Sequence, residues 1–282
     1  MKKQFILAGT GLLVVALLFL FGRTTEPKKP MEAGMPAQAA KTFDVQQFIS
    51  KAKASLTPTQ SIYLSKLENG ISRGDVPAQQ VVAFQGLAAF WKDSMRMFEP
   101  YAFYISEAAK LDNSEKNLTF AAQLFLENLR GESDEAKLNW ETTEAIGLFE
   151  KAIQLNPTND DLRIGLGSCY VYGKGRSGDP QATMKGIQEL LSVVRKDSNN
   201  MKAQMVLGIG GYVSGQYDKA IDRLKKVISK EPNNMEAIAF LADTYAAKGD
   251  KEEAVKWYTL SKKLANNPHY TEEVDRRINQ LK

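Results

Sequence analysis

The feature that most constrains the fold is a pattern of small and apolar residues that recurs every 34 positions. The matching pairs are Ala220 and Ala254, Leu224 and Tyr258, Gly208 and Ala242, and Leu207 and Leu241. A fixed period of this length is typical of repeat proteins, in which one small structural unit is copied along the chain. The pattern predicts two consecutive units, at residues 201–234 and 235–268.

Within each unit the apolar residues have helical spacing. In residues 201–234 the first set is Leu207, Gly208 and Gly211, and the second set is Ala220, Leu224 and Val227. A glycine, at 215 or 249, separates the two sets, and glycine readily ends a helix. Each unit therefore predicts a hairpin of two helices. One hairpin cannot bury its apolar stripe alone, so the copies are expected to stack.

These residues resemble the tetratricopeptide repeat family, which has a small residue at position 8, alanine at 20, a large residue at 24, a small one at 27 and proline at 32. In this chain these positions hold Gly208, Ala220, Leu224, Val227 and Pro232, and then Ala242, Ala254, Tyr258, Ser261 and Asn266. The resemblance implies an all-α fold, an α-solenoid of stacked antiparallel helical hairpins (a TPR superhelix). The family's aromatic residue at position 4 is absent here.

Weaker copies of the pattern extend towards the N-terminus. Residues 160–200 fit one unit with seven extra residues, which are expected in the turn YGKGRSGDPQ. Residues 116–159 fit another, in which EAKLNWETT belongs either to an extended loop or to lengthened helices. Residues 43–115 are expected to form an N-terminal helical region with a degenerate repeat at 82–115. Residues 269–282 are expected to form a polar capping helix.

The first residues predict a single membrane span. Residues 5–22, FILAGTGLLVVALLFLFG, carry no charge, and 18 helical residues reach about 27 Å, enough to cross a hydrocarbon core. This transmembrane signal anchor would follow a short segment at 1–4 and precede a flexible linker at 23–42. The alternative is a cleaved signal peptide, although the run is long for one and lacks an A-x-A site. We expect a single-pass protein of a bacterial inner membrane, with its C-terminal domain in the periplasm.

Charge and composition exclude several functions. The net charge is +4, and the first 40 residues account for most of it, so the remainder lacks the basic surface of a nucleic-acid binder. Cys169 and His269 are the only residues of their kinds, which excludes an intramolecular disulfide and a Cys/His metal site. Cys169 is expected to be buried and His269 to lie on the surface.

The sequence predicts no catalytic, cofactor-binding or metal-binding residues. GLGSCY at 165–170 is not a dinucleotide loop, because Tyr170 stands where the last glycine is needed. YGKGRSG is not a phosphate-binding loop, because Gly175 follows the lysine in place of serine or threonine. Paired carboxylates lie at predicted helix starts, where negative charge favours the helix dipole. An enzyme is therefore not expected.

In the resembling family, positions 2, 5, 9, 12 and 13 of the first helices line a concave groove that receives a partner. The residues mapped onto this groove are Ile164, Ser168, Val171, Tyr172, Met205, Ile209, Tyr212, Val213, Ala239, Asp243 and Ala246. This floor is apolar with two tyrosines, which suits an extended peptide or an amphipathic helix. The alternative is that the N-terminal helices fold into the groove and fill it.

Together these features predict a membrane-anchored scaffold or adaptor that mediates protein–protein interaction in envelope assembly, secretion or division. Its partner would be a protein or peptide, with no nucleic acid and no cofactor. The alternative is a self-associating structural subunit of an envelope complex, a homo-oligomer whose repeats stack between chains.

Overall fold

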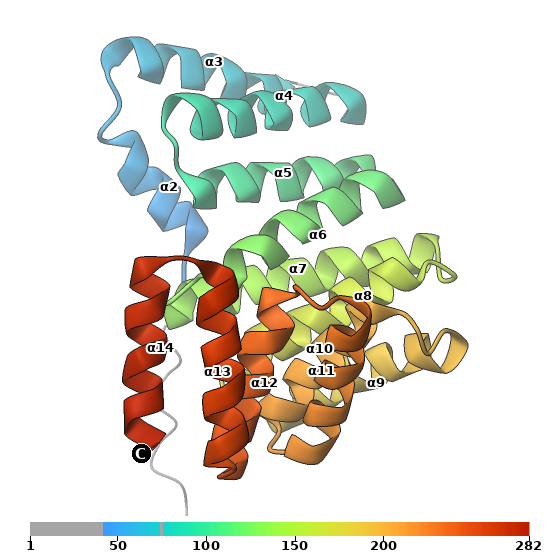
Figure 1. Cartoon of the computed structure of the whole chain (residues 1–282). Coiled ribbons are helices and arrows are strands. Elements are labelled where there is room, and N and C mark those ends of the chain that lie inside the picture. Colours follow the sequence, from blue (N-terminus) through green and yellow to red (C-terminus); the bar gives the residue numbers. More distant parts are fainter. Residues whose placement is uncertain (1–41, 74–75, 282) are drawn as a thin grey trace, which may run out of the picture. The chain divides into compact units, whose positions relative to one another are not determined.

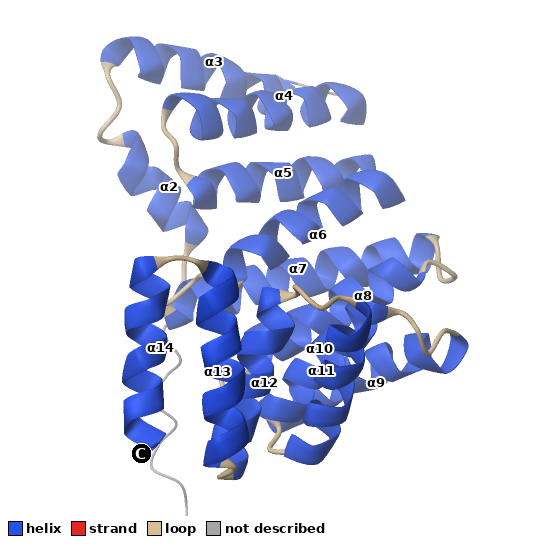
Figure 2. Ribbon diagram, in the orientation of Figure 1, coloured by secondary structure: helices blue, strands red, loops and turns tan. Residues whose placement is uncertain are grey.

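The computed structural model describes residues 42–73 and 76–281, and the regular elements in those residues are all helical (Figure 2). In chain order they are α2 (Val45–Lys53), α3 (Pro58–Arg73), α4 (Pro77–Ala89), η1 (Phe90–Ser94), α5 (Phe98–Asp112), α6 (Glu115–Leu129), α7 (Glu135–Leu155), α8 (Asp160–Cys169), η2 (Tyr170–Lys174), α9 (Pro180–Lys196), α10 (Met201–Val213), α11 (Tyr217–Lys230), α12 (Met235–Lys248), α13 (Lys251–Ala265) and α14 (Pro268–Leu281). The predicted all-α fold is confirmed for this part of the chain.

The anchor predicted at residues 5–22 lies outside the described residues, as does nearly all of the linker predicted at 23–42. Among the helices that are described, none combines the length and the apolar character needed to cross a bilayer.

From α3 onwards, each α-helix packs against the next one in the chain, so the helices form a stack of antiparallel hairpins (Figure 1). The first helices of four successive hairpins, α6, α8, α10 and α12, also contact one another. These four helices form one continuous layer, which carries most of the residues predicted to line the groove. Buried apolar side chains fill the space between this layer and the second helices of the hairpins.

The two regular hairpins are α10 with α11 and α12 with α13. Asn200 and Asn234 begin their first helices, and each side chain accepts a hydrogen bond from a backbone N–H of the first turn. Gly249 ends α12 in a left-handed conformation with φ of 88°, which glycine adopts without steric cost. Gly249 therefore ends a helix where the repeat pattern places a glycine, and the two asparagines that begin the helices stand 34 positions apart.

Small residues stand where the helices of each hairpin cross. Ala220 and Ala254 have no exposed surface. A Cβ added to Gly208 would lie 2.8 Å from the Leu224 side chain, and one added to Gly211 would lie 3.1 Å from the Ala220 Cβ. A larger residue at these positions would push the helices apart. The small residues of the 34-residue pattern therefore lie at the contacts between paired helices.

The two hairpins before them are irregular. Residues 135–143, predicted to be loop or lengthened helix, form the first turns of α7, which has 21 residues. In residues 160–200 the prediction of one long turn is partly wrong. Tyr172, Gly173 and Lys174 continue α8 as the π-helix η2, and only residues 175–178 form a turn, before the N-cap Asp179 of α9. The π-helix η2 accommodates part of the seven extra residues of this unit, because a π-helix has more residues per turn than an α-helix.

The regions predicted at the two ends of the stack are both helical. The degenerate repeat predicted at 82–115 corresponds to α4, η1 and α5, and Asn113 ends α5 with φ of 50°. At the other end, α14 buries Val274 and Ile278 and turns mostly polar side chains outward. This matches the capping helix that a repeat stack requires.

Candidate protein-binding groove

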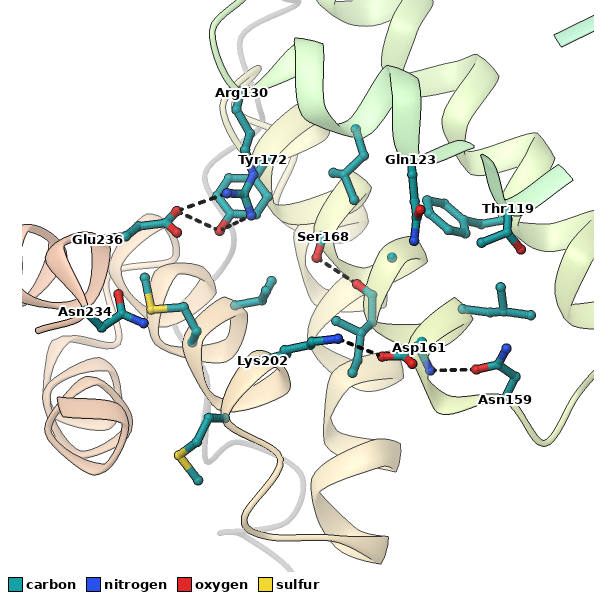
Figure 3. Close-up of a pocket in the computed structure, with 18 of the residues that line it drawn as sticks. Thr119, Gln123, Arg130, Asn159, Asp161, Ser168, Tyr172, Lys202, Asn234 and Glu236 are labelled. Carbon is teal, nitrogen blue, oxygen red and sulfur yellow. Dashed lines mark hydrogen bonds and ion pairs between the residues drawn. The ribbon is translucent and has the colours of Figure 1, made fainter. Parts of the chain in front are cut away.

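The layer of first helices is hollowed by a cavity of about 510 Å³ (Figure 3). Four of the residues predicted to line the groove are in its wall: Ile164, Ser168, Tyr172 and Met205. Further wall residues come from α6, α7 and the start of α12, so the cavity spans several hairpins. We call it the main cavity.

A second cavity of about 360 Å³ follows along the same layer. It contains Val171, Ile209, Tyr212 and Val213, which were predicted to line the groove, and it shares Tyr172 with the main cavity. Phe240 of α12 adds another large apolar side chain, with its ring 6.0 Å from the Tyr212 ring. We call this the apolar pocket.

Three of the predicted residues, Ala239, Asp243 and Ala246, line neither cavity. The Asp243 carboxylate accepts a hydrogen bond at 2.8 Å from Arg277 of α14, and another from the Tyr258 hydroxyl. This end of the predicted groove is therefore engaged by the C-terminal helices. Among the described residues, none from α2 to α5 lines either cavity, so the structure does not support the alternative in which the N-terminal helices fill the groove.

A glycine shapes the floor of the main cavity. Gly165 of α8 lies against Phe149 of α7, and an added Cβ would be 2.3 Å from the Phe149 ring. Because Gly165 has no side chain, the buried Phe149 ring can pass beneath α8 and reach the cavity wall. The Ser168 hydroxyl donates a hydrogen bond to the Ile164 carbonyl, one turn earlier in the same helix, at 2.7 Å. This hydrogen bond stays within α8 and does not cross the cavity.

Three side chains cross the groove between the two cavities, and we call them the bridge: Arg130, Tyr172 and Glu236 (Figure 3). The Tyr172 hydroxyl accepts from Arg130 Nη2 at 3.2 Å and donates to Glu236 Oε1 at 3.2 Å. Arg130 Nη1 lies 3.5 Å from the same Glu236 oxygen. The Arg130 guanidinium also stacks on the Tyr172 ring, 4.4 Å from its centroid.

Burial and exposure determine the protonation of Tyr172 and the strength of the Arg130–Glu236 ion pair. Burial, and next the Glu236 carboxylate, raise the pKa of the Tyr172 phenol, so the hydroxyl keeps its proton and can donate it to Glu236. Arg130 and Glu236 are 45% and 40% exposed in their side chains, and so water screens their attraction. An ion pair with this exposure stabilises a protein by about 0–1 kcal/mol.

Arg176, in the turn after η2, holds the segment that carries Arg130. Its guanidinium donates to the Leu129 carbonyl at 2.9 Å and to the Glu132 carbonyl at 2.9 Å. The last carbonyls of a helix have no partner within that helix, so Arg176 satisfies the end of α6. This fixes the position from which Arg130 reaches over the groove.

Sequence reasoning missed several wall residues. Asp161, Lys202 and Glu236 all occupy position 2 of their units, so the family pattern that predicted the groove could have found them. Asp161 and Lys202 form an ion pair at 3.4 Å across neighbouring first helices. Arg130 and Arg176 lie in irregular connections that correspond to no position of the repeat, and no signal in the sequence marked them.

The groove has the chemistry of a binding surface, with apolar walls and paired charges at the rim. Cys169 is fully buried, and burial raises the pKa of its thiol; His269 is exposed. Both positions are as predicted. In the part of the chain that the structure describes, no three His, Cys, Asp or Glu side chains gather closely enough to hold a metal ion.

Comparison with protein families matches residues 214–272 to the tetratricopeptide repeat. No curated protein matches the chain. Among solved structures, one titled as the crystal structure of MamA protein is 19% identical, with a TM-score of 0.47, covering 67% of this chain and 93% of that one. YrrB, titled as a TPR protein with an unusual peptide-binding site, is 18% identical, with a TM-score of 0.45, covering 74% and 97% of the two chains. The family match supports the predicted resemblance from α11 to the start of α14.

Proposed function

We propose that the protein is a scaffold or adaptor that binds a protein partner through the main cavity and the apolar pocket. The observation that supports this most directly is the pair of cavities along one layer of helices. Their walls combine large apolar side chains with polar and charged groups at the rim. Such a surface suits an extended peptide or an amphipathic helix, because apolar anchors enter pockets while polar groups fix the register. The proposal includes no catalytic role.

The proposal extends to the place of action. The uncharged run at residues 5–22 supports a membrane anchor. In this proposal the linker holds the repeats on the periplasmic side of a bacterial inner membrane. There the scaffold would serve envelope assembly, secretion or division. Alkaline phosphatase fused after residue 282 should be active in cells and remain with the membrane fraction. Activity in the soluble fraction, or a cytoplasmic C-terminus, would contradict this placement.

Photocrosslinking in intact cells tests the binding function. A photoreactive amino acid replacing Tyr212, in the wall of the apolar pocket, should form a covalent product with another protein, identified by mass spectrometry. The same amino acid at Gln188, an exposed position of α9 that lines neither cavity, is the control. If Tyr212 crosslinks only to residues of its own chain, or no more than Gln188 does, the groove is not a receptor.

One observation favours the second candidate, a self-associating subunit. At the end of the stack formed by α3 and α4, Ile62 is 73% exposed and Val82 is 66% exposed (Figure 1). They flank an open groove of about 990 Å³ whose wall has one charged residue, Lys66. Inner hairpins of the stack are covered by another hairpin, and a second copy of this chain would supply the missing cover.

Light scattering of residues 43–282 tests this second candidate. Self-association through α3 and α4 predicts a dimer that Val82→Asp converts to a monomer. Gln188→Asp, at an exposed polar position of α9, is the matched control and should leave the mass unchanged. A wild-type monomer at every concentration would remove the candidate.

A further inference from the structure

The bridge contains a preformed site for a carboxylate oxygen. Two donors, the Arg130 guanidinium and the Tyr172 hydroxyl, converge on a single atom, Glu236 Oε1, at 3.5 and 3.2 Å (Figure 3). The Tyr172 hydroxyl donates a hydrogen bond to this charged oxygen, and the Arg130 guanidinium forms an ion pair with it, so both groups favour an acidic partner. Here the acidic group comes from the chain itself.

The site lies at the mouth of the apolar pocket, whose wall contains all three bridge residues. The remaining charged residue in that wall is Arg176, so two guanidinium groups face one carboxylate. Arg176 is committed to the backbone carbonyls at the end of α6, whereas Arg130 has a long, half-exposed contact with Glu236. Arg130 is therefore the group that can change partners, and the surplus positive charge favours an acidic partner.

Resting on the proposed function, we propose that Glu236 stands in for an acidic residue of the partner. The partner segment carries a large apolar side chain that enters the apolar pocket among Val171, Ile209, Tyr212 and Phe240. A neighbouring aspartate or glutamate of the segment then replaces Glu236 on Arg130 and Tyr172. The bridge thus closes the groove when it is empty and recognises the partner when it is filled.

Binding of designed peptides to the full-length protein in detergent tests this inference. Three capped, fluorescein-labelled peptides share one alanine- and glutamine-rich sequence with a single phenylalanine. They differ only in the residue beside it, which is aspartate, asparagine or lysine. Fluorescence anisotropy should show that the aspartate peptide binds about 5-fold more tightly than the asparagine peptide, and the lysine peptide most weakly.

Variants then separate the two roles of the bridge. Glu236→Gln removes the internal competitor and should tighten binding of the aspartate peptide about 5-fold, while the asparagine peptide is unaffected. Arg130→Gln should abolish the preference for aspartate. Asp218→Asn, which removes a carboxylate from an exposed ion pair with Lys248 outside the groove, is the matched control and should change nothing. A thermal melt of each variant checks that it is folded.

The outcomes are distinct. Equal binding of the aspartate and asparagine peptides would overturn the inference and leave the groove as a receptor for apolar segments. Weaker binding of the aspartate peptide to Glu236→Gln would also overturn it, because Glu236 would then assist binding. If none of the peptides binds, the inference fails, while crosslinking from Tyr212 decides the proposed function independently.

Discussion

The regular hairpins from α10 to α13 and the irregular hairpins from α6 to α9 make different contributions to the groove. The regular pair follows the 34-residue pattern without insertion, and its small residues set the distance between helices. The irregular pair has a lengthened α7, the π-helix η2 and a long turn. Arg130 and Arg176 come from its irregular connections, and Tyr172 comes from η2. Glu236 comes from α12 of the regular pair, so the bridge draws on both pairs, and so does the apolar wall of the two cavities.

The irregular pair is also where packing is tightest. A Cβ added to Gly173 in η2 would lie 2.2 Å from the Thr142 hydroxyl of α7. That hydroxyl donates to the Leu138 carbonyl at 2.6 Å and is fully buried. The lengthened part of α7 therefore packs directly against the π-helix η2. The two segments that depart from the repeat pattern are in contact with each other. The following changes test whether the two pairs differ as described.

The largest expected effect is at Gly165, in the irregular pair. Gly165→Ala should destabilise the protein by about 3 to 4 kcal/mol, because the new Cβ would overlap the buried Phe149 ring. The measurement is urea denaturation followed by circular dichroism. Gly147→Ala is the control, since nothing lies within 4 Å of a Cβ there, and it should stabilise α7 by about 0.5–1 kcal/mol. Equal effects of the two changes would refute the close packing of α7 on α8.

Glu141, in the lengthened part of α7, should make stability depend on pH. It is fully buried, and its Oε1 accepts from Asn128 at 2.8 Å. Burial raises the pKa of its carboxyl from 4.5 to about 7. Between these values the folded protein keeps a proton that the unfolded chain releases, so stability falls as the pH rises from 4.5 to 7.

At 1.36 kcal/mol per pKa unit, the loss of stability is about 3 kcal/mol and is complete above pH 7. Glu141→Gln carries no charge and should abolish this part of the pH dependence in urea titrations at pH 5 and pH 8. Glu150→Gln, at an exposed position of the same helix, should leave it unchanged. A wild-type stability that rises over this range would contradict the assignment.

In the regular pair, Ala254→Leu should destabilise by about 2 kcal/mol, because the larger side chain forces α12 and α13 apart. Ala247→Leu makes the same change at an exposed position of α12 and should be nearly neutral. Thermal melts of the two variants compare them directly. An unchanged melting temperature for Ala254→Leu would mean that the register of the repeat is wrong.

The smallest expected effect is at the bridge that joins the two pairs. Tyr172→Phe removes a hydroxyl that both accepts and donates, and should cost about 1 kcal/mol in urea denaturation. Tyr217→Phe, at the start of α11 and outside both cavities, should cost less. If Tyr172→Phe lowers the free energy of unfolding by more than about 3 kcal/mol, the bridge is a major contributor to folding stability, contrary to the role described here.

The sequence predicted the helices well because their register follows from local spacing and from small residues such as Ala220 and Ala254. It also predicted the apolar floor, since Ile209 and Tyr212 occupy defined positions of a repeat. It failed where position depends on distant packing. The Tyr172 hydroxyl contacts residues 42 and 64 positions away, and no local pattern records such pairs. Asp243 was predicted to face a partner, but Arg277 of the last helix binds it.

Cys169, the last residue of α8, offers a reporter that needs no engineering. It is the single cysteine of the chain, it has no exposed surface, and its thiol pKa is raised by burial. An alkylating reagent can reach the sulfur only when α8 separates from its neighbours, so each modified molecule records one opening of the middle of the stack. The rate of adduct formation, divided by the rate for a fully exposed thiol, therefore gives the opening free energy of this region, and a ligand that bridges the first helices should slow adduct formation.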